Sequence, residues 1–174
     1  MKKLINWRIR YFFKGIYNII RWAPTIYNDR DWDYFYISKL LQKKIEFQKK
    51  YLEKNSKSGN IKNDIFWMNV LLRLIEKEQS GYYEGEYLEY IKRDFEFKDI
   101  DGTDKCYLET VLKWENLDEY INKYKSVKKI ILSTKKIESI EKERLAMFMA
   151  GYRQKKCRNL IFEILKTKSE NWWN

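Results

Sequence analysis

The chain has 174 residues, 44% of them hydrophobic and 17% aromatic, with a formal net charge of +11. This length fits one domain, and the apolar content excludes global disorder. Six glycines and one proline are too few for the many tight turns of a β-sandwich or barrel. We therefore expect an all-α fold: a single-domain helical bundle of about five to seven helices over residues 1–174.

The charge is unevenly distributed along the chain. Residues 1–22 contain six bases and no acids, residues 61–125 contain ten bases and fifteen acids, and residues 126–174 contain twelve bases and five acids. Basic ends thus flank an acidic middle. The remaining surplus favours an anionic partner: a nucleotide, a nucleic acid, an anionic membrane or an acidic protein. The AT-rich codon usage that enriches Ile, Lys, Asn and Tyr is an alternative source of this charge.

Catalytic and metal-binding residue types are scarce. Histidine, the commonest general base and zinc ligand, is absent. Cys106 and Cys157 lie far apart and fit a reducing cytoplasm better than a metal site. No glycine-rich phosphate loop or nucleophile elbow occurs. These patterns predict a protein that is not an enzyme and holds no cofactor or metal.

The N-terminal segment, residues 1–22, predicts a basic amphipathic helix. One face carries Ile5, Ile9, Phe12, Ile16, Ile19 and Ile20, and the other carries Lys3, Trp7, Arg10, Lys14, Tyr17 and Arg21. Interspersed bases exclude a signal peptide and a membrane-spanning helix. Three interpretations stay open: an outer helix of a soluble bundle, that packing together with an anion site, and a helix lying on an anionic membrane surface.

A corner between two helices is expected next. Pro24 disfavours helical geometry at the preceding residue, so the first helix should end there. Asp29 or Asp31 can cap the following helix, which we place from about Asp31 to Lys54, with Trp32 and Tyr36 on one face.

The middle of the chain predicts shorter elements. After a polar loop over 55–60, a largely buried helix should run from Ile61 to Ser80, with Gly81 in the left-handed conformation that ends helices. Residues 82–91 predict a partly buried helix whose tyrosines pack and whose acids pair with basic helices. Without Glu-x-x-His pairs, its glutamates do not fit a di-metal site.

Residues 93–135 contain only weak signals for secondary structure, which change from one short segment to the next. Residues 95–97 suggest a short extended piece, and 99–104 a turn whose glycine and acid spacing do not fit an EF-hand. One helix should then take Leu108, Val111, Leu112 and Trp114, and another should take Leu117, Tyr120, Ile121 and Tyr124. For residues 127–132 we expect a loop or a helix start rather than a strand.

The last helix should run from 135 to 168, capped by Ser133 or Thr134. Arg153, Lys155, Lys156 and Arg158 in its middle spread over more than one face, so some of them should point to solvent or a ligand. Trp172 and Trp173 at the end of the chain should dock on the body or on a second subunit.

Several segments carry a family resemblance. They are Trp22, Pro24, Asp29-Arg30-Asp31-Trp32-Asp33-Tyr34, Leu40-Leu41 and Lys44, then Arg73-Leu74-Ile75-Glu76-Lys77, Tyr82-Tyr83, Glu86-Tyr87, and the closing basic helix with Phe162, Trp172 and Trp173. In these the chain resembles a group of uncharacterised small proteins of tailed bacteriophages. The resemblance implies a phage accessory protein in the cytoplasm of an infected bacterium. Asn174, where the group more often has an acid, and the absence of histidine depart from its pattern.

These observations favour a binding protein. We expect an oligomeric, non-enzymatic counter-defence protein that sequesters an anionic ligand, most concretely a nucleotide immune signal at a subunit interface. The candidate phosphate contacts are Arg8, Arg10, Lys14, Arg30, Arg144, Arg153, Lys156 and Arg158. The alternatives are a nucleic-acid-binding protein with a continuous basic stripe, and a scaffolding or self-assembly protein.

Overall fold

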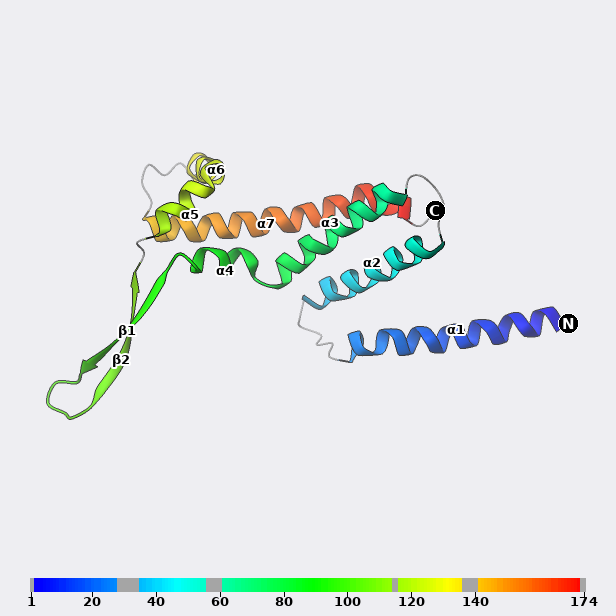
Figure 1. Cartoon of the computed structure of the whole chain (residues 1–174), viewed down its shortest axis with the longest axis horizontal. Coiled ribbons are helices and arrows are strands. Elements are labelled where there is room, and N and C mark those ends of the chain that lie inside the picture. Colours follow the sequence, from blue (N-terminus) through cyan, green and yellow to red (C-terminus); the bar gives the residue numbers. More distant parts are fainter. Residues whose placement is uncertain (1, 28–34, 56–60, 114–115, 136–140, 173–174) are drawn as a thin grey trace. The chain divides into compact units, whose positions relative to one another are not determined.

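The computed structural model describes residues 2–27, 35–55, 61–113, 116–135 and 141–172. Within them the elements are α1 (Lys2–Ile26), α2 (Phe35–Asn55), α3 (Ile61–Gln79), α4 (Tyr82–Leu88), β1 (Lys92–Asp99), β2 (Cys106–Lys113), α5 (Leu117–Lys123), α6 (Lys125–Lys135), α7 (Lys142–Lys168) and a closing 3-10 turn (Ser169–Trp172) (Figure 1). The predicted all-α class with a long C-terminal helix is confirmed, with one two-stranded sheet added.

The chain forms two compact units, Met1–Leu72 and Arg73–Asn174, where the sequence suggests one domain. The first contains α1 and α2. The second contains α4 to α7 and the hairpin. The boundary falls within α3, so a continuous helix connects the two units.

In the first unit, α1 does not end before Pro24 as predicted but continues through it to Ile26. A proline inside a helix removes the bond that its own N–H would donate and crowds the carbonyl group four residues before it, but it does not prevent the following residues from donating their own N–H groups. The helical pattern persists beyond it, because the Tyr27 N–H donates to the Ala23 carbonyl oxygen at 2.9 Å. Residues 29–34, with the predicted caps Asp29 and Asp31 and the motif residues Trp32, Asp33 and Tyr34, lie outside the described residues.

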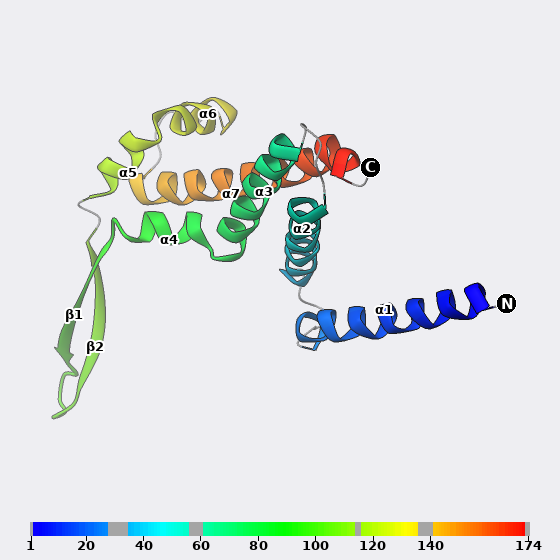
Figure 2. The ribbon, with the colours of Figure 1, turned by 45° about the vertical axis from the view of Figure 1, so that its right-hand side comes forward.

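The second unit is built on α7. A cluster of buried side chains from α5, α6, α7 and the end of the α4 segment forms its core: Ile91, Leu117, Tyr120, Ile121, Ile131, Leu145, Ala146 and Met149. In two views α4 runs beside α7 (Figures 1 and 2). The predicted docking of the terminal indoles holds for Trp172, which is 2% exposed. Trp173 lies outside the described residues.

Two predicted turns are confirmed by their backbone angles. Gly81, between α3 and α4, has a φ of 64°, and Gly102, at the tip of the hairpin, has a φ of 78°. Only glycine adopts this left-handed region at little cost, so Gly81 lets the chain leave α3 and begin α4, and Gly102 lets the hairpin reverse.

The predicted helix over Leu108, Val111 and Leu112 is wrong, because this segment is β2. It pairs antiparallel with β1, with Lys92 opposite Lys113 and Asp99 opposite Cys106. Apolar residues three and four apart fit a helix, but Tyr107, Thr110 and Val111 are also of the aromatic and β-branched types that strands favour. Whether a short run of this kind becomes a helix or a strand depends on whether a partner strand is available.

The predicted start of the last helix is also wrong. Ser133 and Thr134 lie inside α6, where both hydroxyls donate to the Ile130 carbonyl oxygen, at 2.9 and 2.7 Å. A hydroxyl bonded back to the preceding turn is not available to cap the next helix. The last helix, α7, begins at Lys142 and ends at Lys168, the predicted end.

Candidate functional site

Helix α1 carries an apolar stripe that is exposed. Positions three and four apart along one side hold Ile9, Phe12, Phe13, Ile16, Ile19 and Ile20, which are between 38% and 71% exposed. From Trp7 to Tyr27 every side chain is exposed except Arg21, Trp22 and Thr25, which are half-buried. A helix that stood inside a bundle would bury this side.

Helix α2 contacts α1 elsewhere. The Arg21 guanidinium lies over the Phe47 ring, 3.2 Å from its centroid, and the Trp22 ring meets Phe47 edge-on with centroids 5.3 Å apart. At 100° per residue, Arg21 and Thr25 project from the side of α1 opposite Phe12 and Ile16. The packing of α1 on α2 therefore leaves the apolar stripe uncovered.

Cations and aromatic rings occupy the rest of α1: Arg8 and Arg10 flank the stripe, whereas Trp7, Tyr11 and Lys14 project from the opposite side of the helix. All three cations are exposed. The Trp7 and Tyr11 rings lie with centroids 4.6 Å apart, and the Lys14 ammonium group is 5.7 Å from the Tyr11 ring. Since residues 1–22 contain no acid, none of these charges has a carboxylate on its own helix.

The last turns of α1 extend the apolar surface. A depression there is lined by Asn18, Ile19, Trp22, Ala23, Ile26 and Tyr27. Of these, Ile26 is 53% and Tyr27 is 88% exposed. The stripe and this depression form one apolar surface with isoleucines at its centre and with Arg8 and Arg10 beside it. We call it the α1 face.

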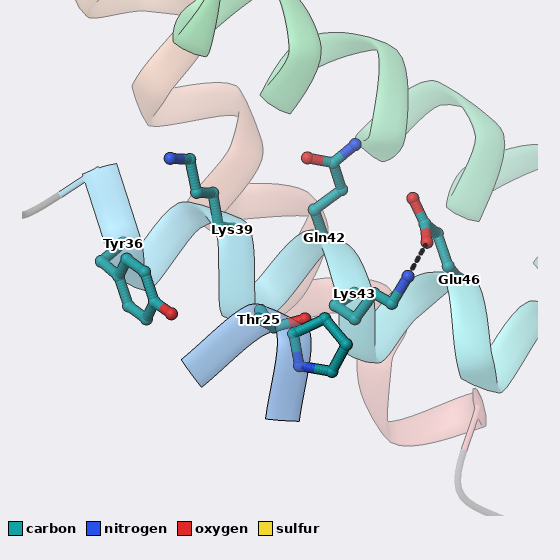
Figure 3. Close-up of a pocket in the computed structure, with 7 residues that line it drawn as sticks. Thr25, Tyr36, Lys39, Gln42, Lys43 and Glu46 are labelled. Carbon is teal, nitrogen blue, oxygen red and sulfur yellow. Dashed lines mark ion pairs between the residues drawn. The ribbon is translucent and has the colours of Figure 1, made fainter. Parts of the chain in front are cut away.

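A second cavity, of about 290 Å³, lies between α1 and α2 (Figure 3). It is lined by Pro24, Thr25, Tyr36, Lys39, Gln42, Lys43 and Glu46. The Lys43 ammonium group and the Glu46 carboxylate form an ion pair at 3.5 Å. Its lining thus carries both charge signs, and it does not gather the positive charge that an anion site needs.

In the second unit, the largest charged cluster surrounds Glu86 of α4, whose side chain is 6% exposed. Its carboxylate accepts bonds from Lys123 Nζ at 2.8 Å and from the Tyr124 hydroxyl at 2.5 Å. Arg153 Nη1 donates to the other oxygen at 2.6 Å. The Arg153 guanidinium also stacks on the Tyr124 ring, 3.6 Å from its centroid. One carboxylate therefore ties α4 to α7 and to the end of α5.

The electrostatics of this cluster fit a structural role. Burial opposes the ionisation of Glu86, but hydrogen bonds from Lys123, Tyr124 and Arg153 outweigh it and lower the pKa of Glu86 to about 2. The bond to Glu86 raises the pKa of Lys123 above its usual range. All members therefore stay charged or bonded near neutral pH, and none is poised to exchange a proton.

The cations predicted from the sequence fall into four groups. Arg8, Arg10 and Lys14 are exposed on α1, and Arg30 lies outside the described residues. On α7, Arg153 is bound to Glu86, and Arg158 donates to the buried Glu78 at 2.8 Å. Arg144 and Lys156 are exposed on α7, with Arg144 5.7 Å from the Phe148 ring. The predicted phosphate contacts thus lie in two different units.

The apolar half of the α1 face is the feature that sequence reasoning underweighted. The amphipathic period and the lack of acids over 1–22 pointed to it, but the sequence does not say whether a neighbouring helix covers it. Within the described residues, no group of three His, Cys, Asp or Glu side chains fits a metal ion. Among the described helices, none combines the length and apolarity needed to cross a membrane.

Comparison with protein-family models, with curated proteins and with solved structures finds no match for this chain.

Proposed function

We propose that this chain is a non-enzymatic protein that binds the surface of an anionic membrane through the α1 face. The single observation that carries the proposal is the exposed apolar stripe on a helix without acids. Helices that lie in the membrane interface combine these features: an apolar face, a basic remainder and interspersed Trp or Tyr.

The two parts of the α1 face have separate roles in this proposal. Phe12, Ile16 and Ile19 enter the boundary between headgroups and acyl chains. Each large apolar side chain that leaves water contributes about 1.5–3 kcal/mol. Arg8 and Arg10, beside the stripe, stay at headgroup level and are attracted by anionic lipid, with about 1 kcal/mol for each cation near the surface. Apolar contact alone would not select anionic lipid, and the cations provide that selectivity.

The test is co-sedimentation of the full chain with vesicles of phosphatidylcholine alone and of phosphatidylcholine mixed with phosphatidylglycerol. We expect binding to the anionic vesicles only, and weaker binding at high salt. The Phe12→Glu variant should lose at least about tenfold in affinity, because it removes an inserted ring and adds a like charge to the lipid.

Tyr17→Glu is the matched control. Tyr17 is 61% exposed and Phe12 is 64% exposed on the same helix, so the two variants carry the same charge change at similar exposure on different sides. If both variants bind equally well, or if the wild-type chain ignores anionic vesicles, the proposal fails.

The capture of a free nucleotide signal, the nucleic-acid alternative and the phage origin stay predictions from the sequence. They give different outcomes with the same sample. A thermal shift with cyclic dinucleotides in the absence of vesicle binding would favour the nucleotide ligand. A salt-sensitive gel shift with duplex DNA or RNA would favour nucleic acid.

A further inference from the structure

The hairpin of the second unit leaves both of its edges exposed. Within the described residues the sheet has only β1 and β2, and both views show the two strands running out beyond α4 and α5 (Figures 1 and 2). Phe95 is 61% and Phe97 is 75% exposed. A two-stranded hairpin without further packing is marginally stable in water, so an additional strand would stabilise it.

The backbone pattern shows which groups of β1 are available for pairing. The Ile100 N–H donates to the Lys105 carbonyl oxygen at 2.9 Å, so the N–H and C=O groups of Ile100 point toward the second arm of the hairpin. In an antiparallel ladder this direction alternates. The N–H and C=O groups of Phe95 and Phe97 therefore point away from β2, along the outer edge of β1.

The side chains of β1 are complementary to a second, antiparallel copy of β1. When the two copies are centred on Glu96, Asp94 stands opposite Lys98 of the partner subunit, and Phe95 stands opposite Phe97 of the partner subunit. Both combinations occur twice by two-fold symmetry. Opposite charges and paired aromatics are the favourable combinations across neighbouring strands.

The charged face of the hairpin continues this pattern. Lys113 binds Asp94 at 2.5 Å, and Lys98 forms an ion pair with Glu109. Across the four strands, charged side chains would then form one row of alternating sign: Lys113, Asp94, the partner's Lys98 and the partner's Glu109. The unfavourable contact is Glu96 with Glu96 of the partner subunit on the axis, and Lys98 of the partner subunit lies diagonally beside it.

We propose that two copies of this chain associate through the outer edges of β1 and form a four-stranded antiparallel sheet. The alternative edge, β2, matches a copy of itself less well: placing Glu109 opposite Lys113 of the partner subunit aligns only residues 109–113, whereas the β1 register aligns 92–100. The dimer does not depend on the proposed membrane binding. If both hold, two α1 faces in one particle would strengthen attachment by multivalency.

A disulfide on the symmetry axis tests the register. In a Cys106→Ser background, Glu96→Cys places two thiols at directly opposed positions, where the Cα atoms of antiparallel strands are about 4.5–5.5 Å apart. With oxidised glutathione we expect a disulfide-linked dimer on non-reducing gels. In the same background, Lys98→Cys places the two thiols about 14 Å apart along the strands and should give none. Equal dimer yields from the two variants, or none from Glu96→Cys, would overturn the proposed register.

A pair of proline variants tests the edge without new thiols. Phe95→Pro removes an outward N–H of β1 and keeps the ladder within the hairpin, and Thr110→Pro does the same on the outer edge of β2, since Thr110 stands opposite Phe95. By sedimentation velocity, Phe95→Pro should weaken self-association at least tenfold and Thr110→Pro should leave it unchanged. Far-ultraviolet circular dichroism checks that both retain their helices. A monomeric wild-type chain, or dissociation by Thr110→Pro alone, would refute the proposal.

Discussion

Helices α1 and α7 are both long and basic, yet their cations are used differently. In α7 the apolar residues Leu145, Met149 and Ile161 are buried, and two arginines are bound to buried glutamates of other elements. In α1 the apolar stripe from Ile9 to Ile20 is exposed and the helix carries no acid. In α7, two basic side chains are therefore bound within the second unit. In α1, the exposed basic side chains are available to a partner.

This difference originates outside the two helices. Glu86 and Glu78 come from the acidic middle of the chain, and their packing against α7 neutralises Arg153 and Arg158. The neighbour of α1 is α2, which presents Phe47 to Arg21 rather than a carboxylate. The function of a basic helix is thus set by the elements that pack on it, more than by its own composition.

The largest expected effect concerns the ion cluster of α7. Glu86→Ala should destabilise the second unit by about 3 kcal/mol, because it leaves the Arg153 guanidinium, with a side chain only 13% exposed, without its carboxylate. The measurement is the free energy of unfolding in urea. Glu89→Ala, at an exposed position of the same segment, should change that energy by no more than about 0.5 kcal/mol. Similar losses for the two variants would mean that the cluster is not what holds α4 to α7.

Acid should weaken the same cluster in a defined range. The pKa of Glu86 is lowered from 4.5 to about 2 in the folded chain, so its contribution to stability is complete above pH 4.5 and is lost as the pH falls toward 2. We expect the urea midpoint of the wild-type chain to fall over this range more steeply than that of Glu86→Gln, which cannot titrate at this position. Parallel curves for the two proteins would assign the acid sensitivity to other carboxylates.

The sequence predicted the helices better than their partners. The end of α3 just before Gly81 followed from a local signal, a glycine that can take the left-handed conformation, and the end of α7 at Lys168 is as predicted. The wrong predictions, a helix at β2 and a cap at Ser133, arose where a local pattern fitted two structures. Pairing with β1 decided the first, and the continuation of α6 through Ser133, whose hydroxyl binds the Ile130 carbonyl oxygen, decided the second.

The candidate site was also predictable only in part. The basic, amphipathic period of α1 was visible in the sequence, and Arg8 and Lys14 were correctly placed in an acid-free helix. The sequence predicted that the acids of residues 82–91 pair with basic helices, and Glu86 does so. It did not identify Arg153 as the partner, because the two residues are 67 positions apart and nothing local connects them. Exposure of the α1 stripe depends on which side of α1 meets α2, which is a property of packing rather than of the helix itself.

The smallest expected effect compares one exposed arginine from each helix. Arg8→Gln should weaken binding to phosphatidylglycerol-containing vesicles about fivefold, because one cation near an anionic surface contributes about 1 kcal/mol. Arg144→Gln makes the same chemical change at an exposed position of α7 and should leave that binding unchanged. If the two variants weaken binding equally, the net charge of the chain rather than the α1 face attracts the lipid. If only Arg144→Gln weakens it, α7 provides the contact surface. A loss confined to Arg8→Gln, and diminishing as salt is raised, would assign the attraction to α1, since screening reduces the contribution of an exposed cation.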